Sequence, residues 1–258
     1  MSEPRQVKLV GILNVTPDSF SDGGKYLEPA NAIAQARQLF ADGATWVDVG
    51  GESTNPGSSI LSIDKEWARL GSVIPDLVKE FPGRISVDTY HPATARKALE
   101  AGVTIINDVT MFRDSDMVDA VADYADKVTC IVSHLSPRAV SIGHAHKEEP
   151  TRTIQEVKEE LMLRRQLLMA RGIPAENIIL DPGIGFGNTA ALNPLLLEFA
   201  KQVPGIPVMI GYSRKRFLGN NRMDAEPNLE AAKIAIASGA TYLRVHDVAA
   251  HKALLDQL

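Results

Sequence analysis

The sequence predicts a (β/α)8 barrel, and three observations favour this fold: the chain length, the alternation of two kinds of segment, and the composition of the strand candidates. The chain has 258 residues, which suits one barrel forming a single domain over residues 1–258. Short runs rich in Val and Ile alternate with longer helical patterns. Short continuous apolar runs are typical of parallel strands that are covered on both faces.

Eight strand candidates occur along the chain, at residues 7–13, 45–49, 84–87, 103–106, 127–132, 177–180, 207–210 and 242–245. Helical segments lie between them, the clearest at residues 30–42, 92–101 and 151–171. Several of these helices end at a glycine, which can adopt the left-handed conformation of a helix cap. An open doubly wound sheet is the competing fold, but no G-x-G-x-x-G turn follows the first strand candidate.

The composition is that of an ordinary globular protein, with 45% hydrophobic and 23% charged residues. The net charge of -5 argues against a nucleic-acid partner. The only cysteine, Cys130, excludes an internal disulfide and a multi-cysteine metal site. It also suits a reducing compartment. No signal pattern and no apolar stretch long enough to span a bilayer occur, so we expect a cytoplasmic protein without a membrane partner.

Polar residues stand at the ends of most strand candidates, where a barrel of this kind carries its active site. Any single Asp or Asn there is better explained as a turn or a helix cap. Their recurrence strand after strand indicates a ring of acceptors and cations around one mouth. The residues are Asn14, Asp48, Asp88, Asn107, Asp108, Asp181, Ser213, Arg214, Lys215, Arg216, Arg244 and His246.

The ring combines groups that suit two kinds of ligand. A flat heterocycle is suited by Asp48, Asp88 and Asp181, with Asn14 and Asn107. Phosphate oxygens are suited by Arg214, Lys215, Arg244 and His246. Asn14 also offers an oxygen to a Mg2+ that keeps most of its waters. The sequence contains no zinc-ligand spacing, Walker loop or nucleophile elbow. We therefore expect catalysis by positioning and charge stabilisation rather than by a covalent intermediate.

Other aromatic and histidine residues carry weaker signals. Trp46 and Trp67 are expected to pack in the core, and His134, His144 and His146 to be ordinary loop histidines. The glycine-rich segment around Phe186 would let an aromatic face approach a planar ligand, although a plain glycine-rich turn would look the same.

Seven motifs of the chain resemble those of the dihydropteroate synthases, in the same order and over nearly the whole length. They are Gly11-Ile-Leu-Asn-Val-Thr-Pro-Asp-Ser-Phe-Ser-Asp-Gly-Gly24, Asp48-Val-Gly-Gly-Glu-Ser-Thr54, Ser86-Val-Asp-Thr89, Ile106-Asn-Asp108, Asp181-Pro-Gly-Ile-Gly-Phe-Gly187, Ser213-Arg-Lys215 and Arg244-Val-His246. The resemblance implies a transferase of folate biosynthesis, a sulfonamide target that is usually a homodimer. Its members join 6-hydroxymethyl-7,8-dihydropterin pyrophosphate to p-aminobenzoate with the help of Mg2+ and release pyrophosphate.

The resemblance also implies a role for each matching residue. The pterin would be held by Asp88, Asn107, Asp181 and Lys215. The pyrophosphate would be bound by Asn14, Arg244 and His246, and Asn14 would also hold the metal. The p-aminobenzoate site would be shaped by Thr54, Pro56, Phe186 and Ser213. The catalytic residues would be Asp22, Asp88 and Lys215, the two carboxylates stabilising the pterin methylene cation by their charge.

The chain departs from the family pattern at three places. Asn55 stands where the second loop of the family has an arginine, and Asn188 where it often has a lysine. The segment Ser133-His-Leu135 replaces Met-His-Met, which the resemblance implies changes a wall of the pterin pocket. The missing arginine keeps a second hypothesis open, a pterin-binding paralogue with weak or no activity. A pterin-dependent methyltransferase is a third hypothesis, disfavoured because it would not need the Ser-Arg-Lys and Arg-Val-His motifs to bind a pyrophosphate.

Overall fold

The computed structural model describes residues 7–15, 29–52, 62–136 and 153–258. All eight strands in these residues are parallel and belong to one sheet, in which sequence neighbours pair and β8 returns to β1. They are β1 (Lys8–Asn14), β2 (Trp46–Gly50), β3 (Ile85–Asp88), β4 (Ile105–Asp108), β5 (Thr129–Ser133), β6 (Ile178–Asp181), β7 (Met209–Ile210) and β8 (Tyr242–Val245). The predicted barrel is confirmed, and every strand candidate overlaps a strand.

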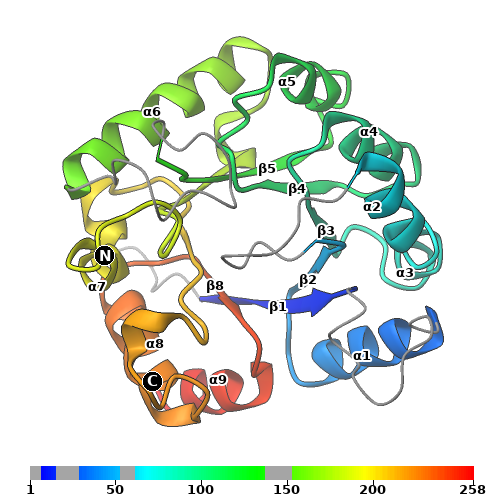
Figure 1. Cartoon of the computed structure of the whole chain (residues 1–258). Helices are drawn as coiled ribbons and strands as arrows, with labels where there is room; N and C mark the ends of the chain where they lie inside the picture. Colours follow the sequence, from blue (N-terminus) through cyan, green and yellow to red (C-terminus); the bar gives the residue numbers. More distant parts are fainter. Residues whose placement is uncertain (1–6, 16–28, 53–61, 137–152) are drawn as a thin grey trace.

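The helices surround the strands as an outer ring (Figure 1). They are α1 (Pro29–Ala41), α2 (Ile63–Leu70), α3 (Ile74–Glu80), α4 (Pro92–Glu100), α5 (Ser115–Ala122), α6 (Ile154–Ala170), α7 (Leu192–Leu195), α8 (Ala225–Ala237) and α9 (Val248–Leu255). The described residues also contain the 3-10 helices η3 (Ala175–Asn177), η4 (Leu196–Gln202) and η5 (Arg216–Leu218). The three predicted helical segments correspond to α1, α4 and α6.

Local sequence explains where several helices begin and end. Thr153 and Glu156 form a reciprocal capping box at the start of α6. The glycines that follow α1, α4, α6 and α8 all have positive φ, between 92° and 105°, as expected for left-handed caps. They are Gly43, Gly102, Gly172 and Gly239.

The barrel closes weakly between β6 and β7. Only an isolated parallel bridge, Leu180 to Val208, joins the two strands, supported by a 3.0 Å hydrogen bond from Leu180 N to Pro207 O. Pro207 has no backbone N–H to donate, and the regular strand begins only at Met209. The closure is therefore the least hydrogen-bonded junction of the ring.

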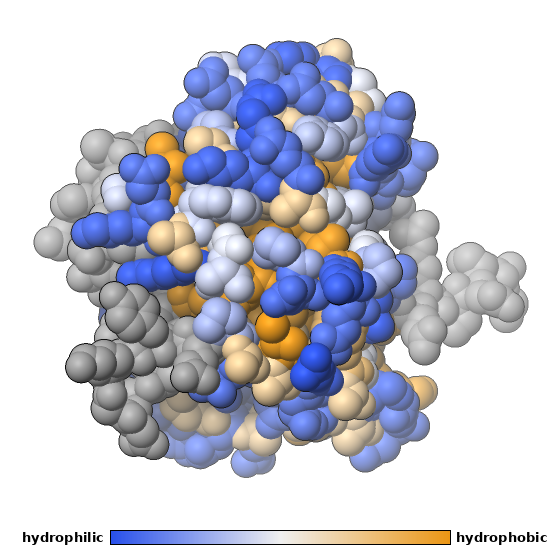
Figure 2. Space-filling view, turned by 90° about the vertical axis from the view of Figure 1, so that its right-hand side faces the viewer, coloured by the Kyte–Doolittle hydropathy of each residue, from blue (hydrophilic) through white to orange (hydrophobic). Residues whose placement is uncertain are grey.

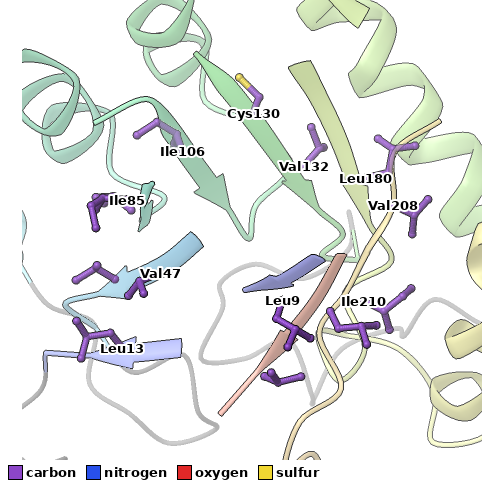
Figure 3. Packing of buried hydrophobic residues seen from close by; sticks show 14 of the residues in the cluster. Leu9, Leu13, Val47, Ile85, Ile106, Cys130, Val132, Leu180, Val208 and Ile210 are labelled. Carbon is purple, nitrogen blue, oxygen red and sulfur yellow. The ribbon is translucent and has the colours of Figure 1, made fainter. Parts of the chain in front are cut away.

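Two apolar layers follow from the alternation of side chains along each strand. Outward-facing residues such as Leu13, Val47 and Ile106 pack against the helices (Figure 3). Inward-facing residues form a separate cluster inside the barrel, made of Val10, Ile105, Ile131, Ile179, Met209 and Tyr242. Trp46 packs on this cluster and stacks on Tyr242 with ring centroids 4.6 Å apart, while Trp67 packs against the outer core. Both tryptophans are packing residues, as predicted.

The face that carries α2, α3 and α4 is mostly hydrophilic, with apolar atoms visible between the charged side chains (Figure 2). Within the four described ranges, none of the helices combines the length and the apolar content needed to span a bilayer.

Candidate active site

A polar layer lies inside the barrel directly above the inner apolar cluster. Side chains two residues apart on a strand point to the same side, so the residue two positions after each apolar one also faces inward. In this way Asn107 follows Ile105, and Asp181 follows Ile179. The inward positions of this layer are Asp48, Asn107, Ser133, Asp181, Gly211 and Arg244.

Arg244 joins two carboxylates across the mouth of the barrel. Its Nε donates to Asp48 Oδ2 at 2.6 Å, and its Nη2 donates to Asp88 Oδ2 at 2.7 Å. Burial lowers the pKa of Arg244, but the two carboxylates more than offset this, so the pKa is raised overall. Arg244 therefore remains a cation and fixes the ends of β2 and β3 relative to β8.

Asp48 is the centre of a buried network. Its Oδ1 accepts a 2.5 Å hydrogen bond from Ser86 Oγ, and its Oδ2 accepts from Asn107 Nδ2 at 2.9 Å as well as from Arg244. Asn107 Oδ1 in turn accepts from Ser133 Oγ at 3.0 Å. On the sequence alone, Asp48 is expected only to offer an acceptor to a flat heterocycle, and Ser133 stands out only as a departure from the family pattern. Ser133 ends β5 in register with Asp181, a position that the predicted strand at 127–132 stops short of.

Asp88 is balanced between its two protonation states near neutral pH. Burial raises the pKa of its carboxyl to about 7, and the neighbouring carboxylates of Asp48, Glu66 and Asp108 add to the increase. Arg244 opposes this by favouring the ionised form. A carboxylate with this pKa is typical of a functional site.

Asp181 is held by the glycine-rich turn that follows β6. Its Oδ1 accepts from Gly183 N at 2.8 Å, and its backbone oxygen accepts from His134 N at 2.9 Å. Burial raises the pKa of Asp181, whereas the Gly183 N–H and the Lys215 ammonium lower it. Asn188, the second departure, donates from Nδ2 to Gly183 O at 2.7 Å and so helps to close the same turn.

Lys215 lies against the Gly-rich turn. Its Nζ donates to Ile184 O and stands 4.2 Å from the centroid of the Phe186 ring. Burial lowers the pKa of Lys215 to about 8, while the Asp181 carboxylate partly opposes the shift. Lys215 thus connects the aromatic residue of this loop with the acidic residues of the polar layer.

Ser213 and His246 form a pair at the ends of β7 and β8, with His246 Nδ1 3.0 Å from Ser213 Oγ. Burial, reinforced by Arg214, Arg244 and Lys215, lowers the pKa of His246 to about 3. The imidazole is therefore neutral at physiological pH.

Two glycines lie close to polar groups of the mouth. A methyl group on Gly50 would lie 3.8 Å from Asn14 Oδ1 and 3.9 Å from Asp88 Oδ2. A methyl group on Gly211 would lie 3.3 Å from Asp181 Oδ2. Asn14 and Asp88 thus both lie near Gly50, and Asp181 lies against Gly211, which places these polar groups around the same mouth.

Asn14 is the residue that the family resemblance assigns to a metal. It is exposed at the end of β1 and offers one amide oxygen beside the Asp88 carboxylate. Within the described ranges no three His, Cys, Asp or Glu side chains are grouped so as to hold a metal ion. One oxygen fits a Mg2+ that takes its other ligands from water and substrate phosphate rather than from a protein cage.

The structure brings most of the predicted site residues together. The residues of this group are Asn14, Asp88, Asn107, Asp181, Phe186, Ser213, Lys215, Arg244 and His246. Asp22, Thr54 and Pro56 lie outside the described residues, as does Asn55. Asp108, which was predicted to belong to the ring, instead holds the turn after β4, because its carboxylate accepts from Thr110 N and Phe112 N at 2.7 and 2.8 Å.

Two polar groups beside the site are buried, which the sequence did not indicate. Glu66 on α2 accepts hydrogen bonds from Thr89 Oγ1 at 3.1 Å and Thr94 Oγ1 at 2.5 Å, although a carboxylate on a helix normally indicates an exposed face. His134 lies in the loop after β5, as predicted, but it is buried and its Nε2 lies 2.6 Å from Glu160 Oε2. His144 and His146 lie outside the described residues.

Comparison with known proteins identifies the family. The family described as "Pterin binding enzyme" matches residues 10–246. The chain belongs to this family. Within it, the chain is 39% identical over 264 aligned residues to the dihydropteroate synthase of Streptococcus pyogenes serotype M3, covering 97% of this chain and 95% of that protein.

Solved structures of the family have the same fold. A dihydropteroate synthase of Xanthomonas albilineans with 4-aminobenzoic acid is 35% identical, with a TM-score of 0.85 over 98% of this chain and 92% of that one. The structure of the Xanthomonas albilineans protein with 7,8-dihydropteroate is 34% identical, with a TM-score of 0.82 over 98% of this chain and 92% of that one. A Yersinia pestis dihydropteroate synthase with a sulfonamide drug is 29% identical, with a TM-score of 0.87 over 98% of this chain and 93% of that one.

Proposed function

We propose that this family member is a dihydropteroate synthase of folate biosynthesis, joining 6-hydroxymethyl-7,8-dihydropterin pyrophosphate to p-aminobenzoate and releasing pyrophosphate. The observation that carries the proposal is the polar layer, in which carboxylates and an amide face the same mouth as Lys215 and Arg244. One side of such a mouth suits a heterocycle and the other suits phosphate. The names and bound ligands of the relatives support the same reaction.

The pterin is assigned to Asp88, Asn107, Asp181 and Lys215. Asp181 is buried and its Oδ2 lies beside Gly211, and in this proposal it accepts N–H groups from the heterocycle. Asn107 supplies an amide, and Lys215 supplies a donor. A buried carboxylate that accepts two N–H groups orients the ring strongly because the bonds are charge-assisted.

The pyrophosphate is assigned to Asn14, Arg244 and His246. A guanidinium has five N–H donors, and the bonds to Asp48 and Asp88 leave others for phosphate oxygens. The neutral His246 ring adds hydrogen bonding without a second charge. Bound Mg2+, held in part by the Asn14 oxygen, would neutralise charge on the departing pyrophosphate.

The reaction then needs stabilisation of charge rather than a covalent enzyme intermediate. When the C–O bond breaks, pyrophosphate takes the electron pair and the pterin methylene becomes cationic. The Asp88 carboxylate, with Asp22 from the first loop, stabilises this cation. The aniline nitrogen of p-aminobenzoate forms the new C–N bond and loses a proton. Phe186, Ser213, Thr54 and Pro56 shape the p-aminobenzoate site in this proposal.

The direct test is turnover. Purified protein is incubated with the pterin pyrophosphate, Mg2+ and p-aminobenzoate, and both dihydropteroate and pyrophosphate are quantified. We expect both products in equal amounts. Asp181→Asn should weaken pterin binding roughly ten- to hundredfold through loss of a charge-assisted acceptor, whereas the exposed Asp123→Asn serves as the matched control.

The outcome separates the three hypotheses. Pterin binding without dihydropteroate would reject the synthase and favour an inactive paralogue. Restoration of turnover by Asn55→Arg would then identify the missing loop cation as the cause. Methyl transfer from methyltetrahydrofolate to a corrinoid would instead favour the methyltransferase.

We also propose a cytoplasmic homodimer in which residues 1–258 form one domain. Leu163 and Leu167 on α6 are 55% and 45% exposed, and they lie four residues apart on one side of the helix. Leu195 on α7 and Ile234 on α8 are also exposed apolar residues, and η4 contacts all three helices. Such side chains suit burial against a second copy of the chain. The buried free Cys130 suits a reducing compartment.

A further inference from the structure

Ser133 lies between two of the residues assigned to the pterin. It ends β5, pairs in register with Asp181 of β6, and is only 3% exposed. Because it stands two positions after the inward-facing Ile131, it faces the interior in the same layer as Asn107 and Asp181. The family resemblance implies only that this departure changes a wall of the pterin pocket, and no contact with Asn107 follows from the motifs.

The contacts of Asn107 fix the orientation of its amide. Asp48 accepts hydrogen bonds from Arg244 and Ser86, so it acts as an ionised acceptor, and only the NH2 end of Asn107 can face it. The 2.9 Å contact to Asp48 is therefore made by Nδ2, which leaves Oδ1 facing Ser133 at 3.0 Å. Ser133 Oγ is the donor that satisfies this oxygen.

Ser133 thereby completes the restraint on Asn107. With the bond to Asp48 alone, the amide is held at one end and a buried carbonyl oxygen lacks its donor. With both bonds, the amide plane is fixed. One N–H and one oxygen lone pair of Asn107 then remain free to form hydrogen bonds with a ligand. An amide held at both ends is preorganised for binding, which reduces the ordering cost when the ligand arrives.

We propose that Ser133 is a positioning residue for the pterin, acting through Asn107 by fixing its amide orientation. The inference rests on the proposed function, since the pterin is the ligand that Asn107 reads. Ser133 has no part in the proposed p-aminobenzoate site, which involves Phe186 and Ser213. Its removal is expected to affect the two substrates differently.

The test compares Ser133→Ala with Ser238→Ala. Ser238 is a matched control because it is also buried, and its Oγ bonds only to the carbonyls of Leu197 and Ala235. Binding of 6-hydroxymethyl-7,8-dihydropterin is measured by calorimetry, and KM for each substrate by pyrophosphate release. We expect Ser133→Ala to weaken pterin binding about three- to tenfold, the effect of one lost hydrogen bond, with KM for p-aminobenzoate unchanged. Ser238→Ala should leave pterin binding unchanged.

A double-mutant cycle with Asn107→Ala distinguishes an action through Asn107 from a direct one. We expect Ser133→Ala to have no further effect on pterin binding once Asn107 is alanine. An equal loss in both backgrounds would overturn the inference, as would wild-type pterin affinity in Ser133→Ala. Failure of the unmodified protein to bind the pterin would instead reject the proposed function, so the two failures are distinguishable.

Discussion

At the scale of single residues, the site holds two ionisable groups whose pKa values are shifted toward each other. Burial raises the pKa of Asp88 to about 7 and lowers the pKa of Lys215 to about 8. The proposed reaction needs Asp88 ionised to stabilise a cation, and Lys215 protonated to donate to the pterin. Both conditions hold together only in a narrow range of pH.

A bell-shaped pH profile of kcat/KM for the pterin substrate is therefore expected. The acid limb should fall as pH decreases through about 7, where Asp88 gains a proton, and the basic limb as pH increases through about 8, where Lys215 loses one. Lys215→Arg should move the basic limb beyond the measurable range, since a guanidinium keeps its charge. The control is Lys233→Arg, because Lys233 is exposed and forms an ion pair with Glu230 on the surface. A basic limb unchanged in Lys215→Arg would contradict the assignment.

The identity of most site residues could be predicted from the sequence, but their pairing could not. Asp88, Asp181 and Lys215 stand out because each follows a strand candidate. Arg244 was predicted to bind phosphate, and nothing in its sequence neighbourhood indicates that it also bridges two carboxylates. Nothing in the sequence indicates that Ser133 and Glu66 are buried. Because they are buried, the hydroxyl of Ser133 and the carboxylate of Glu66 need hydrogen-bond partners.

At the scale of elements, the turn after β6 depends on one close backbone approach. Gly183 has φ +65°, and a methyl group built on it would lie 1.9 Å from His134 O. No small movement of a side chain relieves such a clash, because the obstacle is backbone. The turn that holds Asp181 therefore requires glycine at this position for two separate reasons.

Comparison of two alanine substitutions separates these reasons. Gly83 also has positive φ, at +72°, but a methyl group there meets nothing within 4 Å. Gly83→Ala should cost roughly 1 kcal/mol of unfolding free energy from backbone strain alone. Gly183→Ala should cost several kcal/mol, because β5 and β6 must also separate. Urea denaturation measures both, and equal costs would show that the close approach is not needed.

Elements with a clear period were predictable, and irregular ones were not. The Val- and Ile-rich runs and the glycine caps located all eight strands and the ends of four helices. The link between β6 and β7 consists of the short α7 and the 3-10 helix η4. Neither element was predicted from the sequence. Such short turns depend on packing rather than on a repeating pattern.

At the scale of the whole molecule, the exposed apolar residues of α6, α7 and α8 predict a dimer. Replacing Leu163 and Leu167 together by Glu should halve the mass measured by light scattering, because charges would be buried at the interface. Met223→Glu is the control, since it is 60% exposed and lies outside these helices. A wild-type protein that already has the mass of one chain would reject the dimer.

The two ion pairs of Arg244 also order events during synthesis of the chain. Arg244 is separated along the sequence from Asp48 by 196 residues and from Asp88 by 156 residues. The strands β1 and β8, which pair with each other, are also far apart in the sequence. Contacts so far apart form late, because long loops must close first. A ribosome that has made seven strands has not yet supplied the guanidinium that joins the two acids. Until then Asp48 and Asp88 lack this cation, so the active site is completed only when the eighth strand joins the barrel.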